Sequence, residues 1–280
     1  MSEYSRKMMR VPTINLFREQ DAGKLPVLDV RNLGIDFGGL TAVDSFNITI
    51  GPTEIAGLIG PNGAGKTTIF NLLTGVYQPT RGSVLVNGID IKGMPVHKVN
   101  KLGIARTFQN IRLFSEMTAL DNVKVGMHNE IKCSFLASLL RLPSYYRAEA
   151  AANMKAMELL EFMGLGDVAD QKAGSLPYGV QRRLEIVRAL ATNPSIILLD
   201  EPAAGMNPSE TTELMHQIRR IRDTFHIAIF LIEHDMNLVM NVCETIAVVN
   251  YGKIICKGTP EQVRQNPAVI EAYLGREEEA

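Results

Sequence analysis

The chain has 280 residues, of which 46% are hydrophobic and 21% charged, a composition typical of a globular protein with one large domain or two small ones. Its 29 basic and 30 acidic side chains give a formal net charge of −1, which argues against a protein that binds nucleic acid phosphates. The three cysteines are widely separated and include no Cys-x-x-Cys pair, so we expect free thiols rather than a disulfide framework or a zinc site.

The first 26 residues are polar, with scattered charges and no sustained periodicity, and we expect a tail there. This segment lacks the apolar stretch of a secretory signal, and no run in the chain approaches the ~18 apolar residues of a membrane-spanning helix. Residues 27–32 and 45–50 alternate apolar and polar side chains, which predicts two half-buried strands flanking the turn signal Gly38-Gly39.

A glycine-rich loop follows a short apolar strand predicted over residues 55–59 and precedes a predicted helix over 67–74. The loop fits the pattern G-x-x-x-x-G-K-[ST]. Glycines let its backbone approach phosphate oxygens closely, the lysine adds a positive charge, and the first threonine offers a hydroxyl to Mg²⁺. Pattern and context together favour nucleotide binding over a glycine turn that merely starts a helix. The predicted nucleotide-binding residues here are Gly60, Pro61, Asn62, Gly63, Ala64, Gly65, Lys66, Thr67 and Thr68.

The middle of the chain changes in character. Residues 82–87 predict another strand, but from residue 110 to residue 174 the pattern is helical. The clearest helix is predicted over residues 148–163, which are rich in Ala, Met, Leu and Glu. We therefore expect a helical insert within an α/β core.

Alternating helices and strands return after residue 180. Residues 184–191 predict a helix, and residues 196–199 predict a buried strand of a parallel sheet. This strand delivers Asp200 and Glu201 to its C-terminal end, where open α/β sheets bind ligands. We predict that Asp200 holds Mg²⁺ and that Glu201 orients and deprotonates the attacking water.

Two further apolar strands are predicted over residues 228–232 and 245–249, and helix-capping patterns begin at Asn207 and Thr259. His234 follows the first of these strands, and we expect it to contact the γ-phosphate. Gln109 lies where the first α/β segment gives way to the helical insert, and we predict that its amide binds Mg²⁺ or the attacking water.

These residues, in this order, resemble the ATP-binding cassette (ABC) family over residues 27–260. Gln109 matches the Q-loop of the family, Asp200 and Glu201 match the Walker B pair, and His234 matches the switch histidine. Phe37 takes the aromatic position that stacks on adenine. The resemblance implies an α/β P-loop NTPase core with an N-terminal antiparallel β portion and a helical subdomain insert, and it implies ATP and Mg²⁺ as ligands.

The family signature is where this chain departs from the pattern. The usual Leu-Ser-Gly-Gly-Gln reads here as Leu176-Pro177-Tyr178-Gly179-Val180, without the serine hydroxyl and one glycine. Pro177 has no backbone N–H to donate, although proline tolerates the start of a helix. The resemblance implies that two cassettes face each other, so Leu176, Pro177, Tyr178 and Gly179 would contact the nucleotide held by the partner's phosphate loop.

A narrower resemblance, to the larger ATPase subunit of bacterial branched-chain amino acid importers, rests on five stretches. It implies an ATPase on the cytoplasmic face of the inner membrane that energises uptake of these amino acids. Its partners would be two membrane-spanning permease subunits, a second and different ATPase chain, and indirectly a periplasmic binding protein. The stretches are Arg-Thr-Phe-Gln at 106–109, Leu-Glu-Ile at 184–186, Glu-Pro-Ala-Ala-Gly-Met-Asn-Pro at 201–208, Leu-Ile-Glu-His-Asp-Met at 231–236 and Ala-Tyr-Leu-Gly at 272–275.

Two alternatives stay open on the sequence alone: an ABC transporter for another solute, such as urea or amides, and a soluble ABC ATPase that acts on DNA or ribosomes. A guanine-nucleotide site needs an Asn-Lys-x-Asp motif. The sequence has one Asn-Lys pair, Asn100-Lys101, and it is followed by Leu-Gly, which excludes this class. A small-molecule kinase would share the phosphate loop but would not need Gln109, the signature and His234. The expected organisation is a tail (1–26), a nucleotide-binding core (27–110 and 182–260), a helical signature subdomain (111–181), and a C-terminal helix and tail (261–280).

Overall fold

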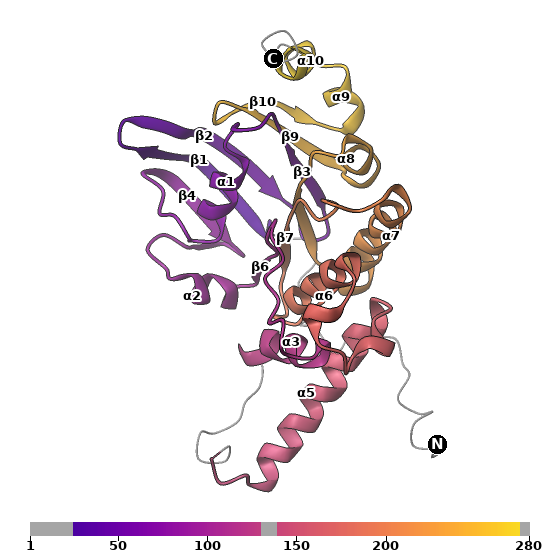
Figure 1. Ribbon diagram of the computed structural model, residues 1–280. Helices are drawn as coiled ribbons and strands as arrows, with labels where there is room; N and C mark the ends of the chain where they lie inside the picture. The colour runs from indigo at the N-terminus through magenta and orange to yellow at the C-terminus, as the bar shows by residue number, and fades with distance from the viewer. Residues whose placement is uncertain (1–24, 130–138, 275–280) are drawn as a thin grey trace. The chain divides into compact units, whose positions relative to one another are not determined.

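The computed structural model describes residues 25–129 and 139–274 (Figure 1). They form two compact units, one of residues 110–193 and the other of residues 25–109 and 194–274. The expected tail lies outside the described residues, apart from its last two positions. The expected second boundary of the helical insert, at residue 181, falls inside helix α6 (Tyr178–Leu190), which packs on the other helices of the 110–193 unit.

The larger unit contains a six-stranded sheet in the order β10-β9-β3-β8-β7-β6 (Figure 1). Strands β9 to β6 in this order are parallel, and β10 is antiparallel to β9. All residues of β3, β7 and β8 are buried, as expected for the centre of a parallel sheet. The strand bounds are β3 (Ile55–Ile59), β6 (Ile104–Arg106), β7 (Ile196–Asp200), β8 (Ala228–Ile232), β9 (Thr245–Asn250) and β10 (Lys253–Gly258).

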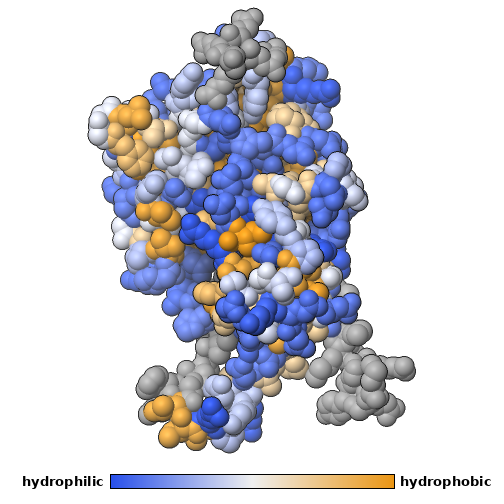
Figure 2. All heavy atoms as spheres, viewed as in Figure 1, coloured by the Kyte–Doolittle hydropathy of each residue, from blue (hydrophilic) through white to orange (hydrophobic). Residues whose placement is uncertain are grey.

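A four-stranded antiparallel sheet in the order β2-β1-β4-β5 forms the predicted β portion of the same unit. Strands β1 and β2 are longer than the alternation predicted, because they pair up to the turn itself, where Phe37 faces Leu40. A hydrophobic patch covers this end of the hairpin on an otherwise largely hydrophilic face (Figure 2). The bounds are β1 (Leu28–Phe37), β2 (Leu40–Ile50), β4 (Arg81–Val86) and β5 (Ile89–Asp90).

One cluster of buried hydrophobic side chains joins the two sheets and helix α1 (Lys66–Leu73). The rings of Phe70 in α1 and Phe230 in β8 lie 5.3 Å apart within it. On the other face of the six-stranded sheet, Gly57 of β3 lies against Cys243, at the end of α8 (Met236–Val242). Cys243 and Cys256 are free thiols, as expected, and Cys133 lies outside the described residues.

The remaining helices of the larger unit are α2 (Val96–Lys101), α7 (Pro208–Phe225), α9 (Pro260–Arg264) and α10 (Pro267–Leu274). Both predicted capping patterns are confirmed. Asn207 and Glu210 form a reciprocal capping box at the start of α7, and Thr259 and Gln262 form another at the start of α9.

The described part of the 110–193 unit is built from helices and turns. Its helices are α3 (Ala119–Gly126), α5 (Pro143–Phe162) and α6, with single 3₁₀ turns at Met127–Asn129, Gly166–Val168 and Ala173–Ser175. Within α6, Arg182 and Glu185 form a fully buried ion pair whose closest N···O distance is 3.2 Å. Among the described helices of the chain, none has the length and apolarity required to cross a membrane.

Candidate active site

The glycine-rich loop joins β3 to α1, and its residues Asn62 and Gly63 are exposed. Gly63 and Gly65 adopt left-handed backbone angles, with φ of 79° and 100°. A Cβ at Gly65 would lie 2.9 Å from the carbonyl oxygen of Ala42, whereas one at Gly63 would meet no atom within 4 Å. Gly65 is therefore required for packing, and Gly63 leaves room for a ligand to approach the backbone. No side chain caps α1, whose first N–H groups have no acceptors within the helix.

Lys66 is held at the base of this loop. Its side chain is buried, and its Nζ donates hydrogen bonds to the carbonyl oxygens of Gly60 (2.6 Å) and Pro61 (2.9 Å). Thr67, which follows it, is exposed at the mouth of the loop. The loop thus presents a fixed positive charge, an accessible hydroxyl and a helix N-terminus together, which suits an anionic phosphate chain.

The turn between β9 and β10 is bonded to the glycine-rich loop and to β2 through backbone hydrogen bonds. The Gly252 N–H donates to the carbonyl of Ala64, and the Gly252 carbonyl accepts from the N–H of Asp44, both at 2.9 Å. Tyr251 and Gly252 have φ of 45° and 76°, the backbone of a tight hairpin turn. This turn was not predicted from the sequence to belong to the site; its one signal was a glycine shortly after the strand predicted over residues 245–249.

Asp200, at the end of β7, is paired with an arginine that the sequence analysis did not assign. Arg106 at the end of the adjacent β6 donates to Asp200 Oδ2 at 2.7 Å and to Asn71 Oδ1 at 2.6 Å. Both partners of the ion pair are buried. The guanidinium group also lies near the rings of Phe70 and Phe108, 5.6 and 5.1 Å from their centroids. This pair fixes the carboxylate at the carboxyl edge of the sheet.

Three predicted catalytic residues meet at the same edge of the sheet. Gln109 Nε2 donates to Glu201 Oε2 at 2.7 Å, and His234 Nε2 lies 2.6 Å from Glu201 Oε1. Both oxygens of the Glu201 carboxylate are therefore contacted by side chains from other loops. Glu201 itself is strained, with a left-handed φ of 47°. The geometry fits a general base that is oriented by its neighbours.

A second carboxylate, that of Glu233, is buried close to Glu201. It is only 3% exposed, and the carboxylate accepts hydrogen bonds from the backbone N–H groups of Ala203, His234 and Asp235. Burial raises its pKa above the ordinary value of a glutamate, and the nearby charge of Glu201 acts in the same direction, while the three N–H groups oppose the shift. Glu233 was not predicted from the sequence to have a role; its one signal was its position as an acid between an apolar strand and the histidine.

Phe37, the predicted adenine-stacking residue, lies at the end of β1 with 44% of its surface exposed. Its ring meets that of Tyr77 edge to face, with centroids 5.4 Å apart. An exposed aromatic face in the same unit as the phosphate loop is consistent with stacking on a base. Tyr77, which contacts this ring, was not identified from the sequence.

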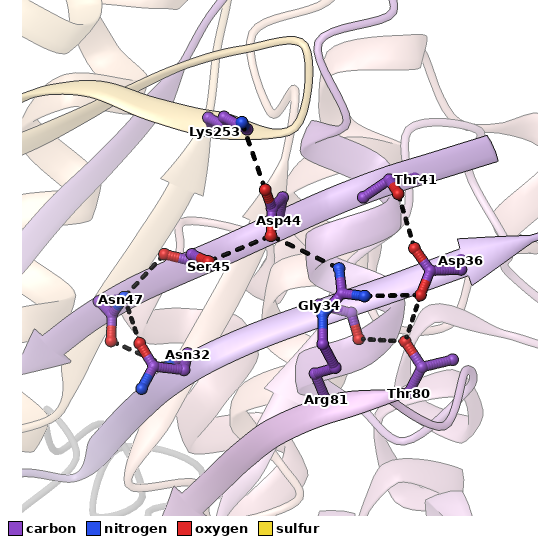
Figure 3. A network of polar contacts seen from close by, with 10 residues as sticks. All are labelled: Asn32, Gly34, Asp36, Thr41, Asp44, Ser45, Asn47, Thr80, Arg81 and Lys253. Carbon is purple, nitrogen blue, oxygen red and sulfur yellow. Dashed lines mark hydrogen bonds and ion pairs between the residues drawn. The ribbon is translucent and has the colours of Figure 1, made fainter. Parts of the chain in front are cut away.

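A polar network holds the strand that carries Phe37 (Figure 3). Arg81 of β4 donates to Asp36 at 2.8 Å and to Asp44 at 3.4 Å, so it bridges β1 and β2. Asp36 also accepts from the hydroxyl of Thr41 at 2.7 Å, and Asp44 pairs with Lys253 of β10 at 3.3 Å. The hydroxyl of Thr41 in particular keeps the pKa of Asp36 below its ordinary value.

The signature segment begins α6 in the 110–193 unit. Pro177 is the N-cap residue of the helix, and no side-chain hydrogen bond caps it. Leu176 is buried, Tyr178 is exposed with the Arg182 guanidinium 5.6 Å from its ring centroid, and Gly179 is half-buried in the first turn. The helix therefore begins directly after Pro177, six residues before the predicted start at residue 184. Contact of Leu176 to Gly179 with a nucleotide stays a prediction.

Comparisons with known proteins match this arrangement. A family model described as ABC transporter matches residues 43–204, and one described as branched-chain amino acid ATP-binding cassette transporter matches residues 253–279. The high-affinity branched-chain amino acid transport ATP-binding proteins BraF of Pseudomonas aeruginosa and LivG of Escherichia coli K12 are each 49% identical to this chain over 250 residues. Each match covers 89% of this chain and 98% of the relative.

Solved structures match most of the chain as well. The crystal structure of the ADP conformation of an ATP-binding cassette of an ABC transporter superposes with a TM-score of 0.76 at 32% identity. The superposition covers 90% of this chain and all of that one. A nucleotide-free cassette from an ABC transporter gives a TM-score of 0.77, also at 32% identity, over 89% of this chain and 99% of the other.

Proposed function

This chain belongs to the ABC transporter family of ATP-binding cassettes, and from that membership we propose that it is the ATP-hydrolysing subunit of an importer for branched-chain amino acids. The observation that carries the proposal is the Glu201 carboxylate, held between Gln109 and His234 in the same unit as a complete phosphate loop.

ATP is the substrate of this site. The backbone of the loop at Gly63 and the N-terminus of α1 would bind the phosphates, and Lys66 would place its charge on the β- and γ-phosphates. Phe37, exposed and supported by Tyr77, would stack on the adenine ring. His234, beside Glu201, would contact the γ-phosphate.

The residues present fit Mg²⁺, which prefers oxygen ligands. Thr67 supplies a hydroxyl at the mouth of the loop, Asp200 a buried carboxylate, and Gln109 an amide oxygen. Mg²⁺ usually takes one or two protein ligands together with substrate phosphates and water, and these side chains suit that arrangement. When bound, Mg²⁺ would neutralise charge that develops on the phosphate oxygens.

In the hydrolytic step, Glu201 would accept a proton from the attacking water at one carboxylate oxygen. Gln109 and His234 reach this carboxylate from two other loops, so that its orientation is set before substrate arrives. Because Glu201 is held in this way, it would increase the rate of hydrolysis by being aligned with the attacking water. It would not act by tightening the binding of ATP.

The solute and the partners are inferred from the relatives. Two relatives named for branched-chain amino acid transport share 49% identity with this chain, and the C-terminal match carries the same description. We therefore assign the chain two membrane-spanning permeases, a second ATPase subunit and, indirectly, a periplasmic binding protein, and a place on the cytoplasmic face of the inner membrane. Transport of urea or amides, and a soluble ABC function, are the alternatives that the test must separate.

The catalytic assignment is tested with Glu201→Gln and Lys66→Ala. Glu201→Gln should still bind MgATP but lose roughly 10²-fold or more of turnover, the scale expected for a missing general base. Lys66→Ala should instead weaken MgATP binding. Glu213→Gln, a change of the same type on the exposed face of α7, should leave both properties unchanged. Near-normal hydrolysis by the Glu201→Gln complex would overturn the role of Glu201.

The solute is tested with the assembled transporter in vesicles. Radiolabelled leucine should enter the vesicles in an ATP-dependent manner, and the Glu201→Gln variant should abolish this uptake. ATP-dependent uptake of urea or an amide without uptake of leucine would replace the solute class and keep the ATPase. Failure of the chain to associate with any membrane subunit would favour a soluble function instead.

A further inference from the structure

We propose that Glu233 is a positioning residue. Its buried carboxylate hydrogen-bonds to the turns that follow β7 and β8, an arrangement that we call the clasp, and thereby sets the position of Glu201 relative to His234. The inference rests on the proposed role of Glu201 in ATP hydrolysis. It assigns a function to a buried acid that would touch neither nucleotide nor metal.

The clasp has one oxygen on each side. Glu233 Oε1 accepts a hydrogen bond from the Ala203 N–H at 2.7 Å, in the turn that follows β7. Its Oε2 accepts from the N–H of His234 at 3.0 Å and from that of Asp235 at 3.4 Å, in the turn that follows β8. A single side chain thereby satisfies backbone donors of two segments that are 30 residues apart in sequence.

The two clasped turns are those that carry the reacting pair. Glu201 lies two residues before Ala203, and His234 directly follows Glu233. Across the gap between the turns, the Glu201 N–H donates to the Ile232 carbonyl at 2.9 Å, and the Glu201 carboxylate meets the His234 ring at 2.6 Å. The Ala203 contact lies C-terminal to Glu201 in the same turn, so the backbone at Glu201 and at Ala203 is bonded to the segment that ends β8 and follows it.

The chemistry of the clasp requires two acceptor oxygens at glutamate length. An ionised carboxylate offers acceptors on both oxygens, whereas a glutamine amide has one oxygen and an NH₂ group that cannot accept. Glu233→Gln therefore keeps the size of the side chain but leaves one turn without its acceptor. Glu233→Asp keeps the charge but is one methylene shorter, so it cannot reach both turns. The two variants separate the reach of the side chain from its charge.

The experiment measures MgATP affinity, KM, kcat and thermal midpoint of the assembled complex for Glu233→Gln, Glu233→Asp and a matched control. The control is Glu244→Gln. Glu244 is an exposed residue directly before β9, and its carboxylate pairs with Arg222 of α7. Both changes at Glu233 should lower kcat on the order of 10- to 100-fold, as expected for a misplaced catalytic group. KM and MgATP affinity should stay within about twofold, because the phosphate loop is untouched.

A double variant tests whether Glu233 acts through the reacting pair. Combining Glu233→Gln with His234→Ala should lose clearly less activity than the product of the two single losses, because groups that act as one unit are non-additive. A merely structural role predicts multiplied losses and a fall in the fraction of protein that binds nucleotide. To exclude that role, kcat is expressed per bound nucleotide.

Three results would overturn the clasp: a Glu233→Gln complex as active as the control, full activity in Glu233→Asp, or losses that multiply in the double variant. These results differ from a failure of the proposed function itself. If the wild-type complex does not hydrolyse ATP, or if Glu201→Gln hydrolyses it normally, the assignment of the base is wrong, whatever Glu233 does.

Discussion

Arg106 and Asp200 illustrate, at the scale of single residues, how the site is held before a nucleotide binds. The two side chains are buried and lie 2.7 Å apart, and Asp200 also receives its backbone position from the Thr107 hydroxyl, which accepts from the Asp200 N–H at 3.3 Å. A buried ion pair is not by itself a large source of stability, but removal of one partner leaves an uncompensated charge. The pair is therefore better understood as a device that fixes the direction of the Asp200 carboxylate.

This asymmetry gives a prediction for stability. Arg106→Leu should lower the free energy of unfolding by ~3–5 kcal/mol, because Asp200 would remain buried and charged without its partner. The double variant Arg106→Leu/Asp200→Leu should recover part of this loss, since it removes the unpaired charge. Urea unfolding in the absence of nucleotide measures both. An equal or larger loss in the double variant would show that packing of the guanidinium against Phe70 and Phe108, and not charge, dominates.

At the scale of elements, the phosphate loop depends on a hairpin that is distant in sequence. Gly252 in the β9–β10 turn hydrogen-bonds to Ala64 in the loop, and a Cβ at Gly252 would lie 2.5 Å from the carbonyl oxygen of Ala42. The turn, the loop and β2 thus approach one another closely through backbone atoms. Any side chain at this position must push two of the three segments apart.

Gly252→Ala should therefore weaken both folding and nucleotide binding. A non-glycine residue with left-handed backbone costs about 1–2 kcal/mol, and the clash with Ala42 should add ~1–3 kcal/mol. Gly93→Ala is the matched control, since Gly93 has a similar φ of 73° but no atom within 4 Å of its Cβ position. Urea unfolding and MgATP titration should show the larger loss of stability, and the only loss of affinity, at Gly252. Equal effects of the two changes would mean that the turn does not support the loop.

At the scale of the whole molecule, the signature segment predicts unequal sites in the proposed pair of ATPases. Helix α6 starts at Pro177 without a side-chain cap and without a serine hydroxyl. A composite site built on this segment would lack one hydrogen bond to a charged group, a loss of about 1.5–3 kcal/mol. A site that uses this chain's Lys66, Glu201 and His234 with the partner's signature lacks nothing on this chain's side.

We expect the two sites to contribute differently to transport. Glu201→Gln in this chain should abolish solute uptake, whereas the equivalent change in the partner ATPase should leave a measurable fraction. Uptake into vesicles, with one subunit altered at a time, measures the difference. Equal losses from the two changes, together with ATPase activity of this chain alone that matches the mixed pair, would show that Gly179 and the helix N-terminus suffice.

The sequence predicted the family, the fold class and the buried strands, and the structure and the comparisons confirm them. Local patterns sufficed here because the phosphate loop, the strand before Asp200 and the cap at Asn207 are each contained in a few neighbouring residues. The sequence did not predict the partners of Asp200 and Ala203. Arg106 and Glu233 contact them from the neighbouring strand β6 and from the turn after β8, and periodicity carries no information on which strands are neighbours. Helix α6 was predicted too short, since helix periodicity does not reveal that Pro177 starts it.

The strand order of the six-stranded sheet has a consequence for how the chain is made. Strand β3, which leads into the phosphate loop, pairs with β8 on one side and β9 on the other, and both are encoded more than 160 residues later. During translation, β3 and the loop emerge early and cannot acquire their neighbours until nearly the entire chain has left the ribosome. Long-range pairing of this kind is slow and exposes hydrophobic strands in the meantime. A messenger truncated before β9 would therefore yield a product that carries the complete phosphate-loop motif but, lacking one of the two strands beside it, holds no nucleotide.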